Sequence, residues 1–182
     1  MNGNNGYSGN DITPEILNYS ELCTGNCRIE PQLYIEHKVN SKGVLTGLTE
    51  ISEIVSKKTV NGEEVPCRGK LYYRGYDVEQ LVAGFIKDGR FGFEEIVYLL
   101  LFGQLPKKEQ LTDFCALLSS YRTLPGSFVR DIIMKAPSAN MMNSLARSVL
   151  TLYSYDANAE DTSVPNVLRQ CLQLTVNTPQ LA

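Results

Sequence analysis

Few residues of this chain could carry out acid–base chemistry. The 182 residues include a single histidine, His37, which stands in a polar stretch. Imidazole is the side chain most used for proton transfer near neutral pH, because its pKa lies there. No nucleophile turn of the GxSxG type and no glycine-rich phosphate loop accompanies it. Residue types alone therefore predict no complete active site, and His37 is interpreted as a surface side chain.

The cysteines offer a second kind of chemistry. Cys23 and Cys27 are spaced like half of a zinc site, but zinc needs four thiolate or imidazole ligands. The sequence has no second close cysteine pair, so we interpret both as ordinary cysteines and expect no metal. Cys115 and Cys171 lie among apolar residues and are predicted to be buried thiols. Five cysteines at irregular spacing are unlike a secreted disulfide framework.

Composition limits the classes of partner. Seventeen basic and 20 acidic side chains give a net charge of −3, whereas nucleic acid calls for a clustered basic face. No apolar run approaches the roughly 20 residues that span a bilayer. The polar N-terminus does not resemble a secretory signal. The sequence predicts a cytoplasmic, soluble protein without nucleic-acid or membrane partners.

The elements that must position these residues change in character along the chain. Residues 1–42 are predicted to be a polar leader, partly disordered, with short helices that include one over residues 14–20. Residues 43–75 are rich in β-branched and aromatic residues, and Asn61-Gly62 predicts a hairpin turn between two strands. Pro66 is expected to shorten the second strand or confine it to an edge.

From Asp77 onward the pattern predicts helices. Asp77 is the expected N-cap of the first, with Gln80 as its capping-box partner. The next helix is apolar nearly all round before Gly103 and should be buried. A later helix, near residues 141–155, is a candidate subunit contact, and packing within its own chain is an equal alternative. Its apolar stripe is Met142, Leu145, Val149, Leu152 and Tyr153, and the last helix is predicted to align Val167, Leu168, Cys171 and Leu172.

Four blocks of sequence resemble the N-terminal part of bacterial citrate synthases. They are GVLTGLTEI (43–51), GKLYYRGYDVEQL (69–81), FGFEEIVYLLLFGQLP (91–106) and LARSVLTLYSYD (145–156). The resemblance implies a mainly α fold, a multi-helix citrate synthase-like N-terminal portion with a small β-hairpin region near residues 43–75. It implies two segments, the leader over residues 1–42 and an incomplete helical domain over residues 43–182.

The resemblance also implies an activity. The family joins acetyl-coenzyme A to oxaloacetate and releases citrate and coenzyme A, as a homodimer, without a metal or a tightly bound cofactor. An aspartate removes the methyl proton, one histidine stabilises the enol and a second polarises the oxaloacetate carbonyl. The motifs that carry these groups are not found in this chain. The resemblance therefore implies no catalytic residue here and predicts an N-terminal fragment that is inactive alone.

Two further expectations concern binding residues. Family members often place a basic segment before the GVLxG block, so Lys38 and Lys42 are predicted to meet coenzyme phosphates, with solvated lysines as the alternative. Arg74 is interpreted as structural, bridging a strand to a helix. The homodimer is expected to form through the helix near Met141 to Tyr155.

Two other functions stay open at this point. One is a 2-methylcitrate synthase, which uses propionyl-coenzyme A, because the acyl pocket is built mainly outside this chain. The other is a stand-alone helical dimerisation module without catalysis.

Overall fold

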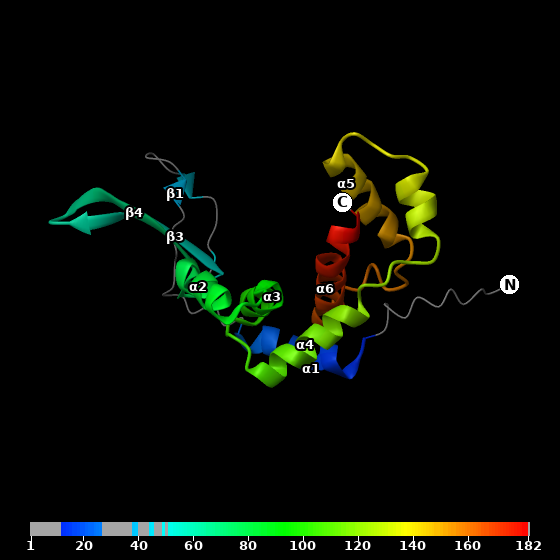
Figure 1. Cartoon of the computed structure of the whole chain (residues 1–182), viewed down its shortest axis with the longest axis horizontal. Coiled ribbons are helices and arrows are strands. Elements are labelled where there is room, and N and C mark those ends of the chain that lie inside the picture. Colours follow the sequence, from blue (N-terminus) through cyan, green and yellow to red (C-terminus); the bar gives the residue numbers. More distant parts are fainter. Residues whose placement is uncertain (1–11, 27–37, 40–43, 46–48, 50, 182) are drawn as a thin grey trace. The chain divides into compact units, whose positions relative to one another are not determined.

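The computed structural model describes residues 12–26, 38–39, 44–45, 49 and 51–181 (Figure 1). Helices dominate it, which confirms the mainly α fold with a small hairpin region. By contacts, the chain divides into two compact units: unit 1 comprises residues 1–24 and 112–182, and unit 2 comprises residues 25–111. None of the described helices combines the length and the apolar character needed to cross a lipid bilayer.

Unit 2 contains the predicted hairpin. Strands β3 (Ser52–Val60) and β4 (Glu63–Tyr73) pair antiparallel around Asn61 and Gly62, whose φ angles are 54° and 85°. Both positive angles suit an Asn-Gly turn, so the hairpin is confirmed. Of the two alternatives expected for Pro66, the shortening is wrong, because β4 continues past it to Tyr73, and the edge position agrees with the described pairing. Pro66 is tolerated because β3 is the only described strand beside it, and the register shifts next to it. A separate pair, β1 (Lys38–Val39) and β2 (Val44–Leu45), is also antiparallel.

A tight turn leads from β4 into the first helix of unit 2. Arg74 and Gly75, with φ angles of 48° and 83°, join β4 to the short strand β5 (Tyr76–Asp77). Asp77 then caps α2 (Val78–Asp88), its Oδ1 accepting from the Glu79 N–H at 2.9 Å. This confirms the predicted N-cap. Gly89 ends α2 in a left-handed conformation.

The core of unit 2 is centred on α3 (Phe93–Phe102). Tyr98, Leu99 and Phe102 have no exposed surface, and the Tyr98 and Phe102 rings pack edge to face at 4.6 Å. The predicted burial is confirmed for these three residues, whereas Phe93 at the start of α3 is 54% exposed. The turn that leads into α3 is tight, because a side-chain carbon at Gly92 would lie 2.2 Å from the Phe85 ring.

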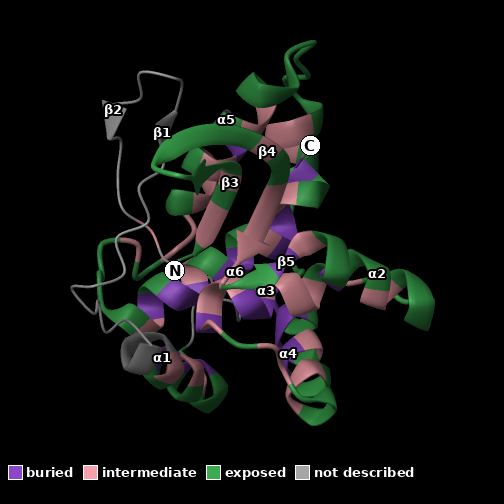
Figure 2. Ribbon diagram, turned by 90° about the vertical axis from the view of Figure 1, so that its left-hand side faces the viewer, coloured by how far each residue is buried: buried purple, intermediate pink, exposed green. Residues whose placement is uncertain are grey.

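Unit 1 is built from helices. Its elements are α1 (Pro14–Asn26), most of α4 (Lys108–Ser120), the π-helical segment η2 (Val129–Met134), α5 (Met141–Tyr153) and α6 (Val164–Leu181). Ile16 of α1 is fully buried, and the Tyr19 ring meets the Phe114 ring of α4 edge to face at 5.6 Å. The buried residues lie mainly on α3, α4 and α6 (Figure 2).

Burial differs along the apolar stripes predicted for the last two helices. Met142 and Tyr153 of α5 are 69% and 55% exposed, whereas Ser148 is the buried residue of this helix. The predicted stripe on α6 also divides. Leu168 and Leu172 point into unit 1, while Val167 and Cys171 face outward, because α6 is apolar on two faces and the described residues cover one of them.

The predicted burial of the two later cysteines is therefore wrong. Cys171 is exposed on the outer face of α6, and Cys115 of α4 is half-buried. An apolar sequence context signals burial only when a partner surface covers that side of the helix.

Candidate functional site

The structure does not describe the side chains of the two predicted coenzyme-binding residues, Lys38 and Lys42. Lys42 and His37 lie outside the described residues, as does Cys27. The backbone of Lys38 belongs to β1, where it pairs with Leu45, but its side chain is not among the described ones. Phosphate binding by Lys38 and Lys42 stays a prediction.

Arg74, in the YRGYD block, supports the architecture of unit 2. Its guanidinium donates two hydrogen bonds, from Nε at 3.2 Å and Nη2 at 3.0 Å, to the carbonyl oxygen of Leu100. Leu100 lies in the last turn of α3, where backbone carbonyls have no partner within the helix. Arg74 therefore ties the β4–β5 turn to the end of α3, and the structural interpretation of this residue is confirmed.

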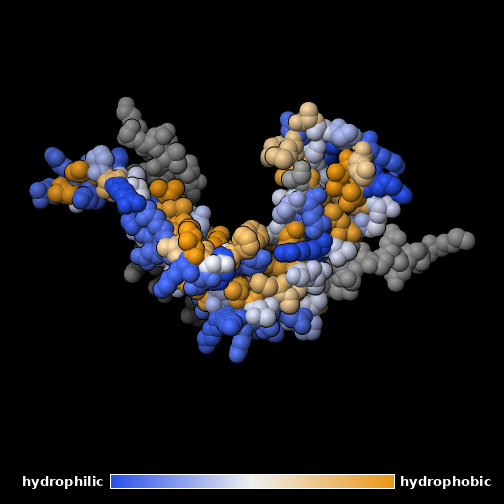
Figure 3. Space-filling view, viewed as in Figure 1, coloured by the Kyte–Doolittle hydropathy of each residue, from blue (hydrophilic) through white to orange (hydrophobic). Residues whose placement is uncertain are grey.

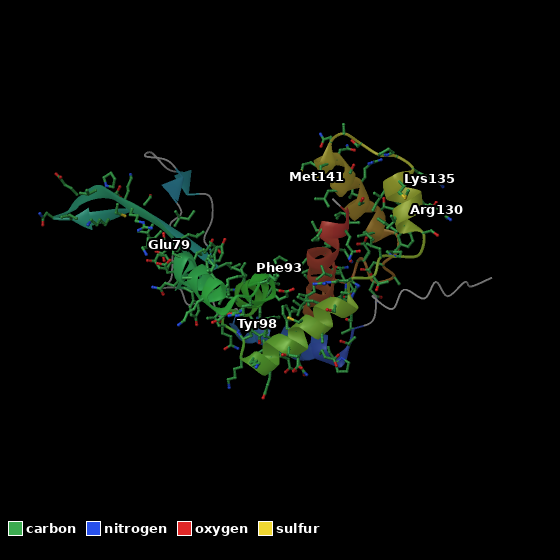
Figure 4. The ribbon with its side chains drawn as sticks, viewed as in Figure 1. Glu79, Phe93, Tyr98, Arg130, Lys135 and Met141 are labelled. Carbon is green, nitrogen blue, oxygen red and sulfur yellow. The ribbon has the colours of Figure 1, made fainter. Side chains whose placement is uncertain are left out.

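The acidic residue of the same block also has a structural partner. The Lys70 ammonium donates to Asp77 Oδ2, while Asp77 Oδ1 caps α2. The Lys70 hydrogen bond, with the Glu79 N–H, holds the pKa of Asp77 below its ordinary value. A carboxylate with a lowered pKa and both oxygens engaged is a poor general base. Glu79, labelled in Figure 4, forms a more exposed ion pair with Arg68 at 2.7 Å.

A polar cluster is buried in unit 1, centred on Arg169 of α6, which has no exposed surface. Its Nη2 donates to Asp156 Oδ2 at 2.7 Å, its Nη1 to Gln173 Oε1 at 2.8 Å, and its Nε to Asn166 Oδ1 at 3.0 Å. Asn166 Nδ2 in turn donates to two carbonyls of the α5–α6 loop, at 2.8 and 2.7 Å. The Arg169 cluster therefore fastens that loop onto α6.

The charge of Asp156 follows from this cluster. Burial acts to raise the pKa of Asp156, but the hydrogen bonds from Arg169, the Asn158 N–H and Gln170 outweigh it, and the pKa lies below its ordinary value. Asp156 is therefore a paired carboxylate in the folded protein at neutral pH. This cluster was not predicted from the sequence. A signal was present in the sequence: Arg169 lies in an otherwise apolar helix, with Asn166 three residues before it and Gln173 four residues after it. Both amides lie on the same side of a helix as the arginine.

Beside this cluster, α5 and α6 enclose a half-open pocket of about 390 Å³, which we call the α5/α6 pocket. Most of its wall is apolar. One polar residue of the wall stands out, because Asn177 is 1% exposed and its Oδ1 accepts no hydrogen bond from any described residue. The lining residues are Val149, Leu150, Leu152, Tyr153, Asp156, Ala159, Gln170, Gln173, Leu174 and Asn177.

The charged groups near the start of α5 are also paired. On η2, Asp131 bonds Arg130 at 2.9 Å and Lys135 at 3.1 Å, and these contacts hold its pKa well below the usual range. Figure 4 labels Arg130 and Lys135, and Met141 where α5 begins. Within the described part of the chain, no three histidine, cysteine or acidic side chains gather as metal ligands would.

The family model and the relatives that match this chain all point to the same family. Residues 40–182 match the family model described as citrate synthase, C-terminal domain. A protein named 2-methylcitrate synthase 1 from Corynebacterium glutamicum is 33% identical over 114 residues, 63% of this chain and 26% of that protein. A citrate synthase from Saccharolobus solfataricus is 31% identical over 121 residues, 66% of this chain and 28% of that protein.

A solved structure extends the similarity to the fold. The crystal structure of citrate synthase from Pyrobaculum aerophilum is similar with a TM-score of 0.59 and 27% sequence identity, over 76% of this chain and 33% of that one. The chain therefore spans about a third or less of the length of these relatives.

Proposed function

Because the chain belongs to the citrate synthase family, we propose that it is part of an enzyme that condenses acetyl-coenzyme A with oxaloacetate. The products would be citrate and coenzyme A. The observation that carries this proposal is the family match over residues 40–182, supported by the fold similarity to the Pyrobaculum enzyme. The resemblance of the four sequence blocks supports a position in the N-terminal part of that enzyme.

We propose further that the 182 residues do not catalyse this reaction alone. The family resemblance implies an aspartate base and two histidines, and the chain contains one histidine. Two carboxylates with little exposed side-chain surface, Asp77 and Asp156, are paired with Lys70 and Arg169. Carboxylates held ionised by such partners are poorly matched to taking a methyl proton at neutral pH. The chain would instead supply a structural part of the enzyme.

Release of free thiol from acetyl-coenzyme A in the presence of oxaloacetate tests both statements. The assay compares the purified 182 residues with the longest open reading frame that contains them. We expect no release above the buffer rate from the 182 residues, and release that needs both substrates from the longer protein. Turnover by the 182 residues would refute their inactivity. A longer protein that folds but never releases thiol would refute the condensation.

A second candidate reaction is supported by the Corynebacterium relative, which is named a 2-methylcitrate synthase. In this alternative, propionyl-coenzyme A replaces acetyl-coenzyme A. The ratio of kcat/KM for the two thioesters, measured on the longer protein, separates the two. A ratio well above one in favour of the acetyl thioester supports citrate as the product, and the reverse ratio supports 2-methylcitrate.

The assembly we propose is a homodimer formed through α5. Leu150, Met142 and Tyr153 of this helix are 75%, 69% and 55% exposed, which leaves a large apolar surface uncovered. Hydrophobic residues are visible over α5 in Figure 3. A dimerisation module without catalysis would use the same surface, and the thiol assay on the longer protein separates it from an enzyme.

The residues that bind the coenzyme phosphates and the cellular compartment of the protein are proposed from the sequence. Lys38 and Lys42 would act as point charges for coenzyme phosphates, since lysine serves well in that role. No tightly bound cofactor is expected. The balanced charge and the irregular cysteine spacing support a cytoplasmic protein.

A further inference from the structure

The outer edge of β3 carries no described strand. β3 pairs with β4 on one side, and the β1–β2 pair forms a sheet of its own. The edge runs over nine residues, from Ser52 to Val60, and contains neither proline nor glycine. An unpaired edge of this kind presents backbone N–H and C=O groups that can pair with a strand of another chain.

The two edges of the hairpin are not equally suited to such pairing. On β4, Pro66 lacks an N–H that could pair with a further strand. Between Val55 and Lys57, β3 has one residue where β4 has three, so the extra residues of the register shift lie on β4. The alternation of side chains along β3 is therefore regular, and β3 is the edge that can accept a strand.

The side chains of β3 are complementary to those of a second β3. When two identical antiparallel strands are related by a two-fold axis, residues equally far before and after the central residue lie opposite each other. With Val55 at the centre, Glu53 of each copy lies opposite Lys57 of the other copy. These three side chains point to the same face, because β-strand side chains alternate. Two Glu–Lys pairs thus form by symmetry, and such cross-strand pairs are stabilising.

Neighbouring registers lack this match. With the centre at Ile54, Glu53 lies opposite Val55. With the centre at Ser56, it lies opposite Thr59, and in neither register do opposite charges meet within β3. A centre between two residues is excluded, because a two-fold axis perpendicular to the sheet keeps each side chain on its own face.

The edge is also accessible. The Lys57 side chain is 45% exposed, and its ion pair with Glu64 is long, at 3.4 Å. Ile54, on the opposite face, is 64% exposed. Figure 1 shows β3 and β4 extending beyond α2 as a two-stranded ribbon. Such a ribbon is only marginally stable by itself, so further strands would stabilise it.

We propose that a second copy of this chain pairs its β3 antiparallel with β3 of the first, around a two-fold axis at Val55. The sheet of unit 2 then continues from one copy into the other, and the Glu53–Lys57 pairs set the register. This contact is separate from the homodimer proposed through α5 and does not depend on the reaction. A chain that forms both contacts links homodimers into larger assemblies.

Cross-linking of introduced cysteines tests the register. Val55→Cys places two thiols opposite each other, with Cβ atoms about 5 Å apart. The matched control is Thr59→Cys on the same face of β3, whose two Cβ atoms would lie roughly 27 Å apart. A short bifunctional maleimide is added to the 182-residue protein, and mass spectrometry of the linked peptides separates these links from those of the native cysteines. We expect a link between copies at position 55 and none at position 59.

Charge reversal tests the pairing itself. Every protein in this experiment also carries Leu150→Ser, which weakens the proposed α5 contact because Leu150 is 75% exposed on that helix. Glu53→Lys and Lys57→Glu should each raise the dissociation constant, measured by sedimentation, at least about tenfold, because two attractive pairs become repulsive. An equal mixture of the two variants should regain the association, since every lysine again meets a glutamate.

Three results would overturn the inference. They are a link at position 55 no stronger than at position 59, a mixture that associates no better than either variant alone, and a Leu150→Ser protein that stays monomeric at its highest soluble concentration. The α5 homodimer is tested separately, by the association of the protein without Leu150→Ser, and the thiol assay tests the reaction.

Discussion

Replacing Arg169 with methionine tests whether the Arg169 cluster holds unit 1 together. Methionine fills much of the same volume but removes the Arg169 donors of Asn166 Oδ1 and Gln173 Oε1. Asp156 Oδ2 also loses its Arg169 donor and keeps the one from Gln170 Nε2 at 3.0 Å. Removing one partner of a buried ion pair costs about 3–5 kcal/mol. Because the Asp156 side chain is 14% exposed and can regain some water, we expect a loss near the lower end, about 3 kcal/mol.

Urea unfolding followed by circular dichroism measures this loss. With a slope of about 2 kcal/mol per molar urea, 3 kcal/mol corresponds to a midpoint lower by ~1.5 M. The matched control is Arg68→Met, which breaks an ion pair of the same 2.7 Å length whose side chains are 78% and 59% exposed. Exposed pairs contribute little, so the control should not shift the midpoint measurably. A loss below about 1 kcal/mol for Arg169→Met would refute the structural role of the cluster.

The stability difference between the wild type and Arg169→Met should also depend on pH. The pKa of Asp156 is lower in the folded protein than the ~3.9 of an unfolded aspartate. Its contribution to stability is therefore fully present above about pH 4 and is lost as the pH falls through the folded-state pKa. The difference in urea midpoint between wild type and Arg169→Met should be constant from about pH 7 to 5 and shrink below about 4. A difference that grows on acidification would contradict this assignment.

Three other variants follow, two from local geometry and one from the predicted phosphate contacts. Arg74→Ala leaves a carbonyl at the end of α3 without its donors and should lower stability by about 1–2 kcal/mol in urea unfolding, whereas no change would show that water replaces the guanidinium. Gly92→Ala places a carbon 2.2 Å from the Phe85 ring and should lower the melting temperature by several degrees, an effect absent only if the ring can move aside. Lys38→Ala with Lys42→Ala, made in the longer protein, should raise KM for acetyl-coenzyme A severalfold and leave KM for oxaloacetate unchanged. Equal changes in both would argue against phosphate binding.

Local sequence signals were sufficient where neighbouring residues determine the structure. The Asn61-Gly62 turn needs only two residues that tolerate positive φ, and the Asp77 cap needs only a short acceptor before a helix. Both could be predicted because the groups that interact are close in the sequence. Pro66 follows such a rule too, since it stands where β4 has no described strand on its other side.

Features that depend on distant partners could not be predicted in the same way. Cys171 looked buried because its neighbours are apolar, but exposure depends on which side of α6 the rest of unit 1 covers. Arg169 finds Asp156 thirteen residues earlier in the sequence, across the α5–α6 loop. No periodicity marks that pairing. The α5/α6 pocket likewise arises from the spacing of two helices and not from a motif in either one.

The central claim is that this chain belongs to an enzyme that condenses an acyl thioester with oxaloacetate. The most direct measurement uses the longest open reading frame that contains the chain, with acetyl-coenzyme A labelled with ¹³C in the acetyl group, and identifies the product by mass spectrometry. The account predicts citrate that carries both labelled carbons, formed only when oxaloacetate is present. Labelled acetate without labelled citrate would contradict it, because the protein would then hydrolyse the thioester without forming a carbon–carbon bond.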